Sequence, residues 1–398
     1  MAPTFDIPKE FQADLTLVDI TDERTNEVIL DSLTQYVPVT SEKNVWAYWH
    51  AGVKAMPQWC QHNVIDWVRI LGSEWTVRIL DTVPGSPNHV LNFVPADLLP
   101  ETFIKGTMNG PYTGQHSADF IRGALLYTHG GVNIDVGCIL IKHLDRICWN
   151  ELEDPHSPYQ VAVPIMFSQT IANHFVAARR GDPFIRRWHQ LFTHIWKGRN
   201  SHEGISDDPL IAFSKEIGFE RASEANFTWD FKVSPLTLME YIAQVVCWQR
   251  LYMFEDAGDG FSCSDYWQKH ILCWDVQAEN WGGEMTVGFD GAGQKMYDLL
   301  SLKRDIDPES EEYKKASELV WRLLTKSSMQ KITHGKNLTH SVHLGTLWDK
   351  NPGKDCEEGT FGELLRYGTV MFRQTRETIV RKEATKAKVL LKKGVLEP

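Results

Sequence analysis

The sequence predicts an α/β fold in which helices flank a mostly parallel central sheet. Strand-like and helical stretches alternate from residue 44 to about residue 200, which is typical of parallel strands joined by helices. The chain has 398 residues, of which 42% are hydrophobic and 11% aromatic, so it can bury a large core. A glycine pair, Gly130-Gly131, separates a helical stretch from a strand-like one. These observations indicate one large domain with additions, or two lobes.

The predicted elements are identified by hydrophobic periodicity and by turn residues. Residues 1–40 are expected to form an appendage whose apolar side chains pack against the main body. The 139–141 stretch is expected to continue the central sheet. In chain order, the elements are a strand, a helix and a strand within 44–100, a helix in 117–129, strands in 132–136, 139–141 and 159–163, a run in 173–178 leading to a helix from Asp182-Pro183, and a helical run in 236–253.

Composition and charge exclude several classes of protein. The sequence lacks the run of about eighteen apolar residues that a membrane-spanning helix needs, and its first residues lack a basic, apolar signal pattern. The seven cysteines have no close paired spacing, which disfavours a zinc site or a disulfide framework. We therefore expect a cytoplasmic protein with no membrane partner.

The stretch from Ser117 to Gly137 carries the strongest functional pattern. Asp119 and Arg122 are three residues apart on a helix, so they project from the same side. Asp135 follows a predicted strand, at the edge where α/β sheets place their ligands. An alternative is that Asp119 and Arg122 form an ordinary surface ion pair and Asp135 caps a turn. Their combination in this order favours a shared site.

These residues resemble a known family. The pattern is similar to the sugar-binding region of the capsular-polysaccharide-synthesis glycosyltransferases that carry an Asp-x-Asp motif. The similar parts are Ser117-x-Asp119-x-x-Arg122, Gly130-Gly131, Asp135 and an earlier run from Val45 to Gly52. The resemblance implies a glycosyltransferase-A-like catalytic domain over 41–350. It also places Asp119 and Arg122 near the transferred group and Asp135 near a metal and diphosphate. By the same resemblance, the substrate-binding residues are Trp46, Tyr48, Ser117, Asn133 and His343.

One departure from the family pattern concerns the metal. Where the family has a second aspartate, this chain has Gly137. A divalent ion prefers several oxygen ligands, so the loss of a carboxylate weakens that role. If the chain does transfer a sugar, Asp135 and His343 are expected to share Mn²⁺ or Mg²⁺. A structural histidine is the alternative for His343.

The last stretch of the chain is basic. Residues 366–393 carry a net charge of +7, which leaves −18 for the rest of a chain whose total is −11. We predict a basic C-terminal helical tail over 351–398 that contacts polyanions, because clustered cations displace counterions from phosphates. The alternative is a solvated amphipathic helix. The predicted RNA-binding residues are Arg373, Arg376, Arg381, Lys382, Lys386 and Lys388.

These observations lead to a functional hypothesis. The degraded metal motif and basic tail resemble the fungal arginine-containing cyclodipeptide synthases of secondary metabolism, which would join arginine and a second amino acid from aminoacyl-tRNAs, including arginyl-tRNA, into a diketopiperazine. This chemistry requires no cofactor, and Asp119, Asp135 and His343 are candidate bases, with Arg122 stabilising negative charge. The alternatives are a cytosolic nucleotide-sugar-dependent glycosyltransferase acting on a small metabolite and an inactive RNA-binding module.

Overall fold

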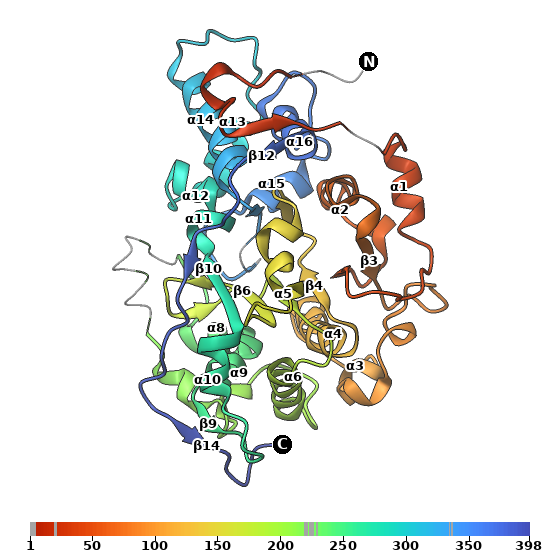
Figure 1. The fold of residues 1–398 in the computed structure, drawn as a ribbon, viewed down its shortest axis with the longest axis vertical. Helices are drawn as coiled ribbons and strands as arrows, with labels where there is room; N and C mark the ends of the chain where they lie inside the picture. The colour runs from red at the N-terminus through yellow and green to blue at the C-terminus, as the bar shows by residue number, and fades with distance from the viewer. Residues whose placement is uncertain are drawn as a thin grey trace.

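A computed structural model of the chain describes residues 5–19, 22–218, 222, 227, 230–333, 335 and 337–398. Helices surround an eight-stranded mixed sheet, which confirms the predicted α/β class (Figure 1). In spatial order the strands are β13 (Arg381–Lys382), β10 (Ile271–Asp275), β6 (Val161–Met166), β8 (Phe175–Ala178), β4 (Gly131–Ile134), β2 (Asn44–Tyr48) and β3 (Thr76–Leu80), with β7 (Thr170–Ile171) paired to β6.

The strand directions determine where a ligand site can form. β2 pairs in parallel with β3 and β4, and β6 pairs in parallel with β10. β8 lies antiparallel between β4 and β6, so the two parallel groups point the same way. The sheet is therefore mostly parallel, as predicted, with β8 inserted and β13 antiparallel at one edge. The carboxyl ends of β2, β4 and β6 consequently share one side of the sheet.

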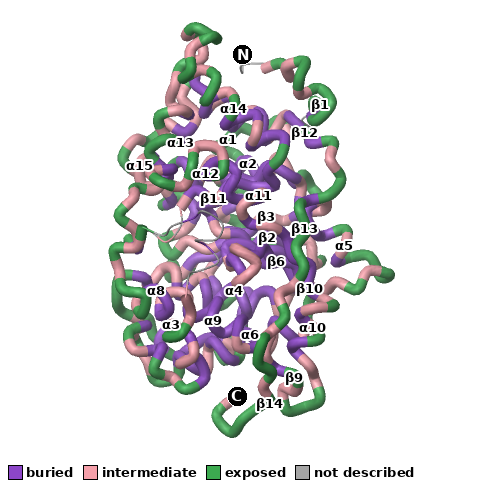
Figure 2. Tube along the Cα trace, turned by 90° about the vertical axis from the view of Figure 1, so that its left-hand side faces the viewer, coloured by how far each residue is buried: buried purple, intermediate pink, exposed green. Residues whose placement is uncertain are grey.

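The sheet separates two hydrophobic cores, because successive side chains of a strand face opposite ways. On β2, Val45 and Ala47 belong to the first core and Trp46 to the second. Figure 2 shows the buried chain through the centre of the molecule. Helices of the first core are α1 (Asn26–Ser32), α2 (Gln58–Leu71), α13 (Ala292–Leu300), α14 (Glu311–Lys326), α15 (Leu344–Lys350) and α16 (Phe361–Met371). Helices of the second core are α4 (Thr113–His129), α6 (Pro183–Ile195), α9 (Ala243–Tyr252) and α10 (Cys263–His270).

Shorter helices connect these elements. They are α3 (Glu101–Ile104), α5 (Asn150–Glu153), α8 (Pro235–Tyr241), α11 (Val276–Asn280) and α12 (Gly282–Val287). Within the described part of the chain, no helix combines the length and apolar character that crossing a bilayer requires.

The predicted helix, glycine pair and strand are present, and they position Asp135. α4 ends at His129 and is capped by Gly130, which has φ +71° and donates its N–H to the carbonyl of Leu126. A side chain on Gly131 would place its Cβ 2.5 Å from the carbonyl oxygen of Asn44, so only glycine lets β4 lie this close to β2. Asp135 follows the last residue of β4 directly.

The stretch after Asp135 does not continue the central sheet, so that prediction is wrong. A turn in which Cys138 donates its N–H to the carbonyl of Asp135 redirects the chain. β5 (Cys138–Leu140) then pairs with β11 (Met329–Lys331) in a separate two-stranded sheet. The physical reason is that β2 and β8 already occupy both sides of β4.

The prediction of a basic helical tail over 351–398 is wrong for the part that follows Met371. α16 ends at Met371, and the chain then runs in extended form along the body, from β12 (Phe372–Gln374) past β13 to β14 (Leu391–Lys392), as the blue segment in Figure 1 shows. β12 pairs with β1 (Leu15–Leu17), and β14 pairs with β9 (Phe254–Asp256). The β-branched run Thr378-Ile379-Val380 favours extended backbone, and burial of Ile379 holds it against the sheet.

Candidate active site

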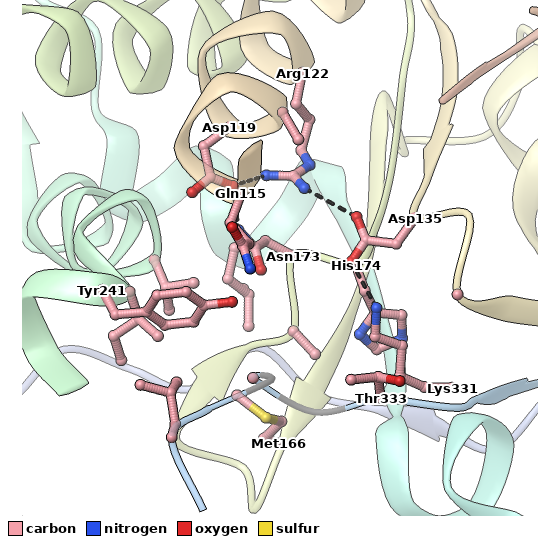
Figure 3. Close-up of a pocket in the computed structure, with 18 of the residues that line it drawn as sticks. Gln115, Asp119, Arg122, Asp135, Met166, Asn173, His174, Tyr241, Lys331 and Thr333 are labelled. Atoms are coloured by element: carbon pink, nitrogen blue, oxygen red, sulfur yellow. Dashed lines mark hydrogen bonds and ion pairs between the residues drawn. The ribbon is translucent and has the colours of Figure 1, made fainter. Parts of the chain in front are cut away.

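A cavity of about 660 Å³ lies at the carboxyl ends of β2, β4 and β6. Tyr48, Asp135 and Met166, each at or just after the end of one of these strands, line it. Asp119 and Arg122 reach the same wall from α4. The structure therefore brings together the three residues that the sequence singles out, and Figure 3 shows them side by side.

Arg122 connects the two carboxylates. Its Nη2 donates to Asp135 Oδ1 at 3.2 Å, its Nε donates to Asn133 Oδ1 at 3.0 Å, and its Nη1 donates to Asp119 and Gln244. Burial alone would lower the pKa of this guanidinium, but the two aspartates outweigh burial and raise it. Because its side chain is only 3% exposed, Arg122 is held as a fixed charge between two carboxylates.

Amide side chains complete the environment of Asp119. Asn173 Nδ2 donates to Asp119 Oδ1 at 3.2 Å and to Gln244 Oε1 at 3.0 Å. Gln244 Nε2 donates to the backbone carbonyl of Asp119 at 2.5 Å. The other carboxylate oxygen, Oδ2, lies 3.8 Å from His116 Nδ1, which is beyond hydrogen-bond distance. Asp119 is thus oriented through one oxygen while the other can accept from a ligand.

Asp135 has a second cationic partner that the sequence did not reveal. Lys331 Nζ, from the end of β11, donates to Asp135 Oδ2 at 2.7 Å. Burial would raise the pKa of Asp135, but Lys331 and Arg122 outweigh burial and lower it. Burial would lower the pKa of Lys331, but Asp135 outweighs burial and raises it. Both groups are therefore charged at neutral pH. The four residues Asp119, Arg122, Asp135 and Lys331 are called the cavity network below.

Much of the cavity lining is apolar or aromatic. Figure 3 shows the Tyr241 hydroxyl pointing into the cavity from the side away from Asp135. Burial raises the pKa of Tyr241, so the hydroxyl stays neutral and can donate a hydrogen bond. Elsewhere the cavity is lined by the apolar side chains of Met166, Ile171, Leu238, Ile242, Val245 and Trp281.

The other predicted substrate-binding residues divide into two groups. Tyr48 and Asn133 line the cavity. Trp46 does not, because it is fully buried in the second core and donates Nε1–H to the carbonyl of Gly130 at 2.8 Å. Ser117 is also buried and donates its hydroxyl to the carbonyl of Thr113 at 2.7 Å. These two side chains orient α4 and β4 rather than a ligand.

His343 lies elsewhere. It is the N-cap residue of α15 and lines a separate cavity of about 70 Å³. The predicted metal pair of Asp135 and His343 is therefore not assembled, because the two side chains line different cavities.

Three of the six tail cations predicted to bind RNA contact acids of the body. Arg376 forms two hydrogen bonds of 2.7 Å with the fully buried Glu279, Arg381 pairs with Glu151, and Lys382 lies 3.0 Å from Asp275. The side chains of Arg373, Lys386 and Lys388 are exposed. The paired cations join the extended tail to the rest of the molecule, which explains their clustering without a nucleic acid.

A second group of ionisable residues lies between α2 and α16. His62 Nδ1 is 2.8 Å from Asp355 Oδ2 and 3.7 Å from Cys356 Sγ. This spacing could hold a metal ion, but Arg366 Nη2 also contacts Asp355 Oδ2, at 2.7 Å. Burial alone would lower the pKa of His62, but the hydrogen bonds that it makes with Asp355 and Cys356 raise it to about 9. His62 is thus protonated, and a metal ligand must not be. We call His62, Asp66, Asp355 and Arg366 the interface network.

The sequence did not reveal several residues that line the cavity or support its walls. Lys331 is 196 residues from Asp135, and Gln244 is 122 residues from Arg122. No local pattern joins residues so far apart in the chain. Tyr241 lies in the predicted helical run 236–253, and helical spacing does not indicate that its hydroxyl enters a cavity. Asn173 begins a strand-like run and carried no functional signal of its own.

The chain matches known proteins over nearly its whole length. A family model described as capsular polysaccharide synthesis protein matches residues 8–205. The probable glycosyltransferase FCK3 of Fusarium pseudograminearum is 57% identical over 393 residues, which is 99% of each chain. The chain belongs to the capsular polysaccharide synthesis protein family. The family resemblance seen in the sequence is thereby confirmed.

Other relatives of this family member carry similar names. Glycosyltransferase afumC of Aspergillus fumigatus is 39% identical, and the match covers 94% of this chain and 96% of the afumC chain. O-glycosyltransferase braB of Annulohypoxylon truncatum is 37% identical, over 96% of this chain and 92% of the braB chain. The solved structure of PaToxG glycosyltransferase is 15% identical, and the match covers 57% of this chain and 84% of the PaToxG chain. Its TM-score of 0.30 is too low to support an argument about the fold.

These relatives correct the functional hypothesis. This family member is a transferase, as expected. The tRNA-dependent cyclodipeptide synthase prediction is wrong, because relatives that match nearly the whole chain are named glycosyltransferases. Aminoacyl-tRNA as a partner is wrong for the same reason. The nucleotide-sugar alternative agrees with the relatives better.

Proposed function

We propose that this family member transfers a sugar from a nucleoside diphosphate sugar to a hydroxyl group of a small, largely apolar acceptor. The observation that carries this proposal is a single cavity whose lining combines the charged side chains of Asp119, Asp135 and Lys331 with many apolar and aromatic side chains. A diphosphate sugar is polar and anionic, whereas the apolar walls favour a hydrophobic molecule.

The names of relatives support oxygen as the accepting atom. O-glycosyltransferase braB and O-glycosyltransferase PaGT of Phomopsis amygdali, which is 35% identical over 89% of this chain, are both named for transfer to oxygen. In such a transfer, the bond between the sugar's anomeric carbon and the diphosphate oxygen breaks. A bond to the acceptor oxygen forms, the acceptor hydroxyl gives its proton to water or to the diphosphate, and the nucleoside diphosphate leaves with the electron pair of the broken bond.

The contacts suggest different roles for two residues. Arg122 directs N–H groups to Asn133, Asp119, Gln244 and Asp135, so it acts as a positioning residue. Asp119 lines the cavity, and its Oδ2 can accept a hydrogen bond from a sugar or acceptor hydroxyl. Asp119 therefore orients hydroxyl groups near the reacting carbon.

The proposal is tested by incubating the purified protein with UDP-glucose, UDP-N-acetylglucosamine or GDP-mannose and a panel of apolar alcohols. Mass spectrometry would detect a glycoside, and a coupled assay would detect release of nucleoside diphosphate. We expect Asp119→Asn to lower kcat/KM roughly 100-fold, because a hydroxyl-orienting carboxylate is lost. Lys386→Gln, on the exposed tail, is the matched control and should leave transfer unchanged. Nucleotide release without a glycoside, at equal rates in both variants, would contradict the proposal.

A further inference from the structure

The lost second aspartate of the Asp-x-Asp pattern and Lys331 occupy neighbouring positions. A Cβ built on Gly137 would lie 3.8 Å from Lys331 Nζ and 3.6 Å from the Trp59 ring, both ordinary contacts. Gly137 does not have the positive φ that requires glycine, so its backbone would tolerate a side chain. The ammonium therefore lies between the remaining carboxylate, Asp135, and the position where a second carboxylate would project.

This arrangement does not fit a divalent ion. Both oxygens of Asp135 already contact cations, Oδ1 with Arg122 at 3.2 Å and Oδ2 with Lys331 at 2.7 Å. Asp119 is held by Arg122 in turn. A metal ion would need these oxygens as ligands and would meet the repulsion of a buried ammonium at contact distance. The family's metal role and the donor set of this chain thus disagree.

We propose that Lys331 Nζ is the fixed cation that binds the diphosphate of the sugar donor, in the place where the Asp-x-Asp resemblance implies a metal ion. This inference rests on the proposed function and deepens it. An ammonium has three N–H donors, and Asp135 accepts one of them, so others can be offered to phosphate oxygens. As the bond to the sugar breaks, negative charge grows on the diphosphate, and a nearby cation stabilises it.

The surrounding backbone holds Lys331 in place before a donor binds. Lys331 pairs with Cys138 in the β5–β11 ladder, and Ile332 donates its N–H to the carbonyl of Gly137 at 2.9 Å. The Lys331 side chain is 12% exposed and faces Asp135, which is 32% exposed toward the cavity. A cation held in this way needs little reorganisation when the leaving group develops charge.

The test measures binding of UDP, GDP and inorganic pyrophosphate by calorimetry, in the presence of EDTA and in the presence of Mn²⁺. For the wild-type protein we expect the affinity of the tightest of these probes to change by less than about twofold between the two conditions. Lys331→Met should weaken binding roughly 10- to 100-fold, because a charge-assisted contact to phosphate is lost, whereas Lys331→Arg should retain most of it. A thermal melt of each variant checks that it is folded.

A second pair of variants exchanges the lysine for a metal site. Gly137→Asp combined with Lys331→Met restores two carboxylates without the ammonium, so its binding of UDP should become dependent on Mn²⁺. Gly137→Ala with Lys331→Met is the matched control and should remain independent of Mn²⁺. Three results would each overturn the inference. The wild-type protein could lose its binding of these probes in EDTA, or Lys331→Met could bind them as tightly as the wild type. The third is that UDP binding by the variant with Gly137→Asp and Lys331→Met does not respond to Mn²⁺.

These outcomes separate the inference from the proposed function. Metal-dependent binding together with sugar transfer would overturn the role of Lys331 and leave the glycosyltransferase proposal intact. Diphosphate binding that depends on Lys331, without a glycoside from any donor, would overturn the proposed function and leave the diphosphate site.

Discussion

Two arginines of this protein each lie between two aspartates, and the two networks differ in what surrounds them. In the cavity network, Arg122 contacts Asp119 and Asp135. In the interface network, Arg366 contacts Asp66 at 3.2 Å and Asp355 at 2.7 Å. The Asp135 side chain is 32% exposed toward a cavity, whereas the Asp355 side chain is 1% exposed. The same pairing of charges can therefore serve a ligand in one place and the packing of helices in the other.

The difference in exposure indicates where each network acts. In the interface network, His62 from α2 and Arg366 from α16 both contact Asp355, so its charge is compensated entirely by protein. In the cavity network, Asp135 and Lys331 form one wall of a space large enough for a substrate. Changes in the interface network should alter the free energy of unfolding, and changes in the cavity network should alter transfer.

The largest effect on stability is expected for Arg366→Met. Two buried carboxylates, Asp66 and Asp355, would lose their guanidinium partner, which should lower the free energy of unfolding by about 3–5 kcal/mol. Urea denaturation followed by circular dichroism measures this. Arg373→Met, an exposed arginine of the tail, is the control and should change stability by less than about 0.5 kcal/mol. Equal stability of the two variants would remove the distinction between buried and exposed arginines.

A matched pair of aspartate variants compares the two networks directly. Asp135→Asn should lower kcat/KM roughly 100-fold, because the carboxylate that orients Lys331 is lost, while the unfolding free energy falls by about 1 kcal/mol. Asp355→Asn should lower the unfolding free energy by about 2–4 kcal/mol and leave transfer by the folded protein within about twofold. Sugar transfer assays and denaturation curves on both proteins check this. The comparison fails if Asp355→Asn abolishes transfer while the protein remains folded.

The pH dependence of stability should report on His62. Its pKa is raised to about 9 in the folded protein, against about 6.5 in an unfolded chain. Because the folded state holds the proton more tightly, this stabilisation is complete below about pH 6.5 and is lost as the pH rises through about 9. The wild-type free energy of unfolding should therefore fall by roughly 2–3 kcal/mol more than that of His62→Gln across this window. Parallel curves for the two proteins, measured by denaturation at a series of pH values, would exclude the protonated His62–Asp355 pair.

The smallest effect is expected where the charges belong to neither network. Lys386 and Lys388 are exposed on the extended tail. The double change Lys386→Gln, Lys388→Gln should shift the unfolding free energy by less than about 0.5 kcal/mol and leave transfer unchanged. Denaturation and sugar transfer assays measure both quantities. A large loss in either would mean that these lysines contact part of the molecule or of the substrate after all.

The sequence predicted those parts of the fold and site that depend on neighbouring residues. Helical spacing placed Asp119 and Arg122 on one side of α4, and the glycine pair correctly separated that helix from β4 and Asp135. The alternation of elements predicted the α/β class. It could not predict the route of β5, because leaving the sheet depends on which strands already flank β4.

The tail illustrates the opposite case. Its dense cations suggested a helix for a polyanion, yet the backbone is extended and Arg376 binds Glu279, a residue 97 positions earlier in the chain. A local count of charges reports how many cations are present but not which buried acid they neutralise. The N-terminal strand β1 likewise finds its partner β12 near the other end of the chain.

Local spacing along α4 and β4 thus determined where Asp119, Arg122 and Asp135 point. Folding over long distances in the chain decided what they meet: Gln244 beside Arg122, and Lys331 against Asp135. The physical reason is that helix and strand geometry is set by residues a few positions apart, whereas the partner of a buried charge is whichever distant side chain compact packing brings to the same depth.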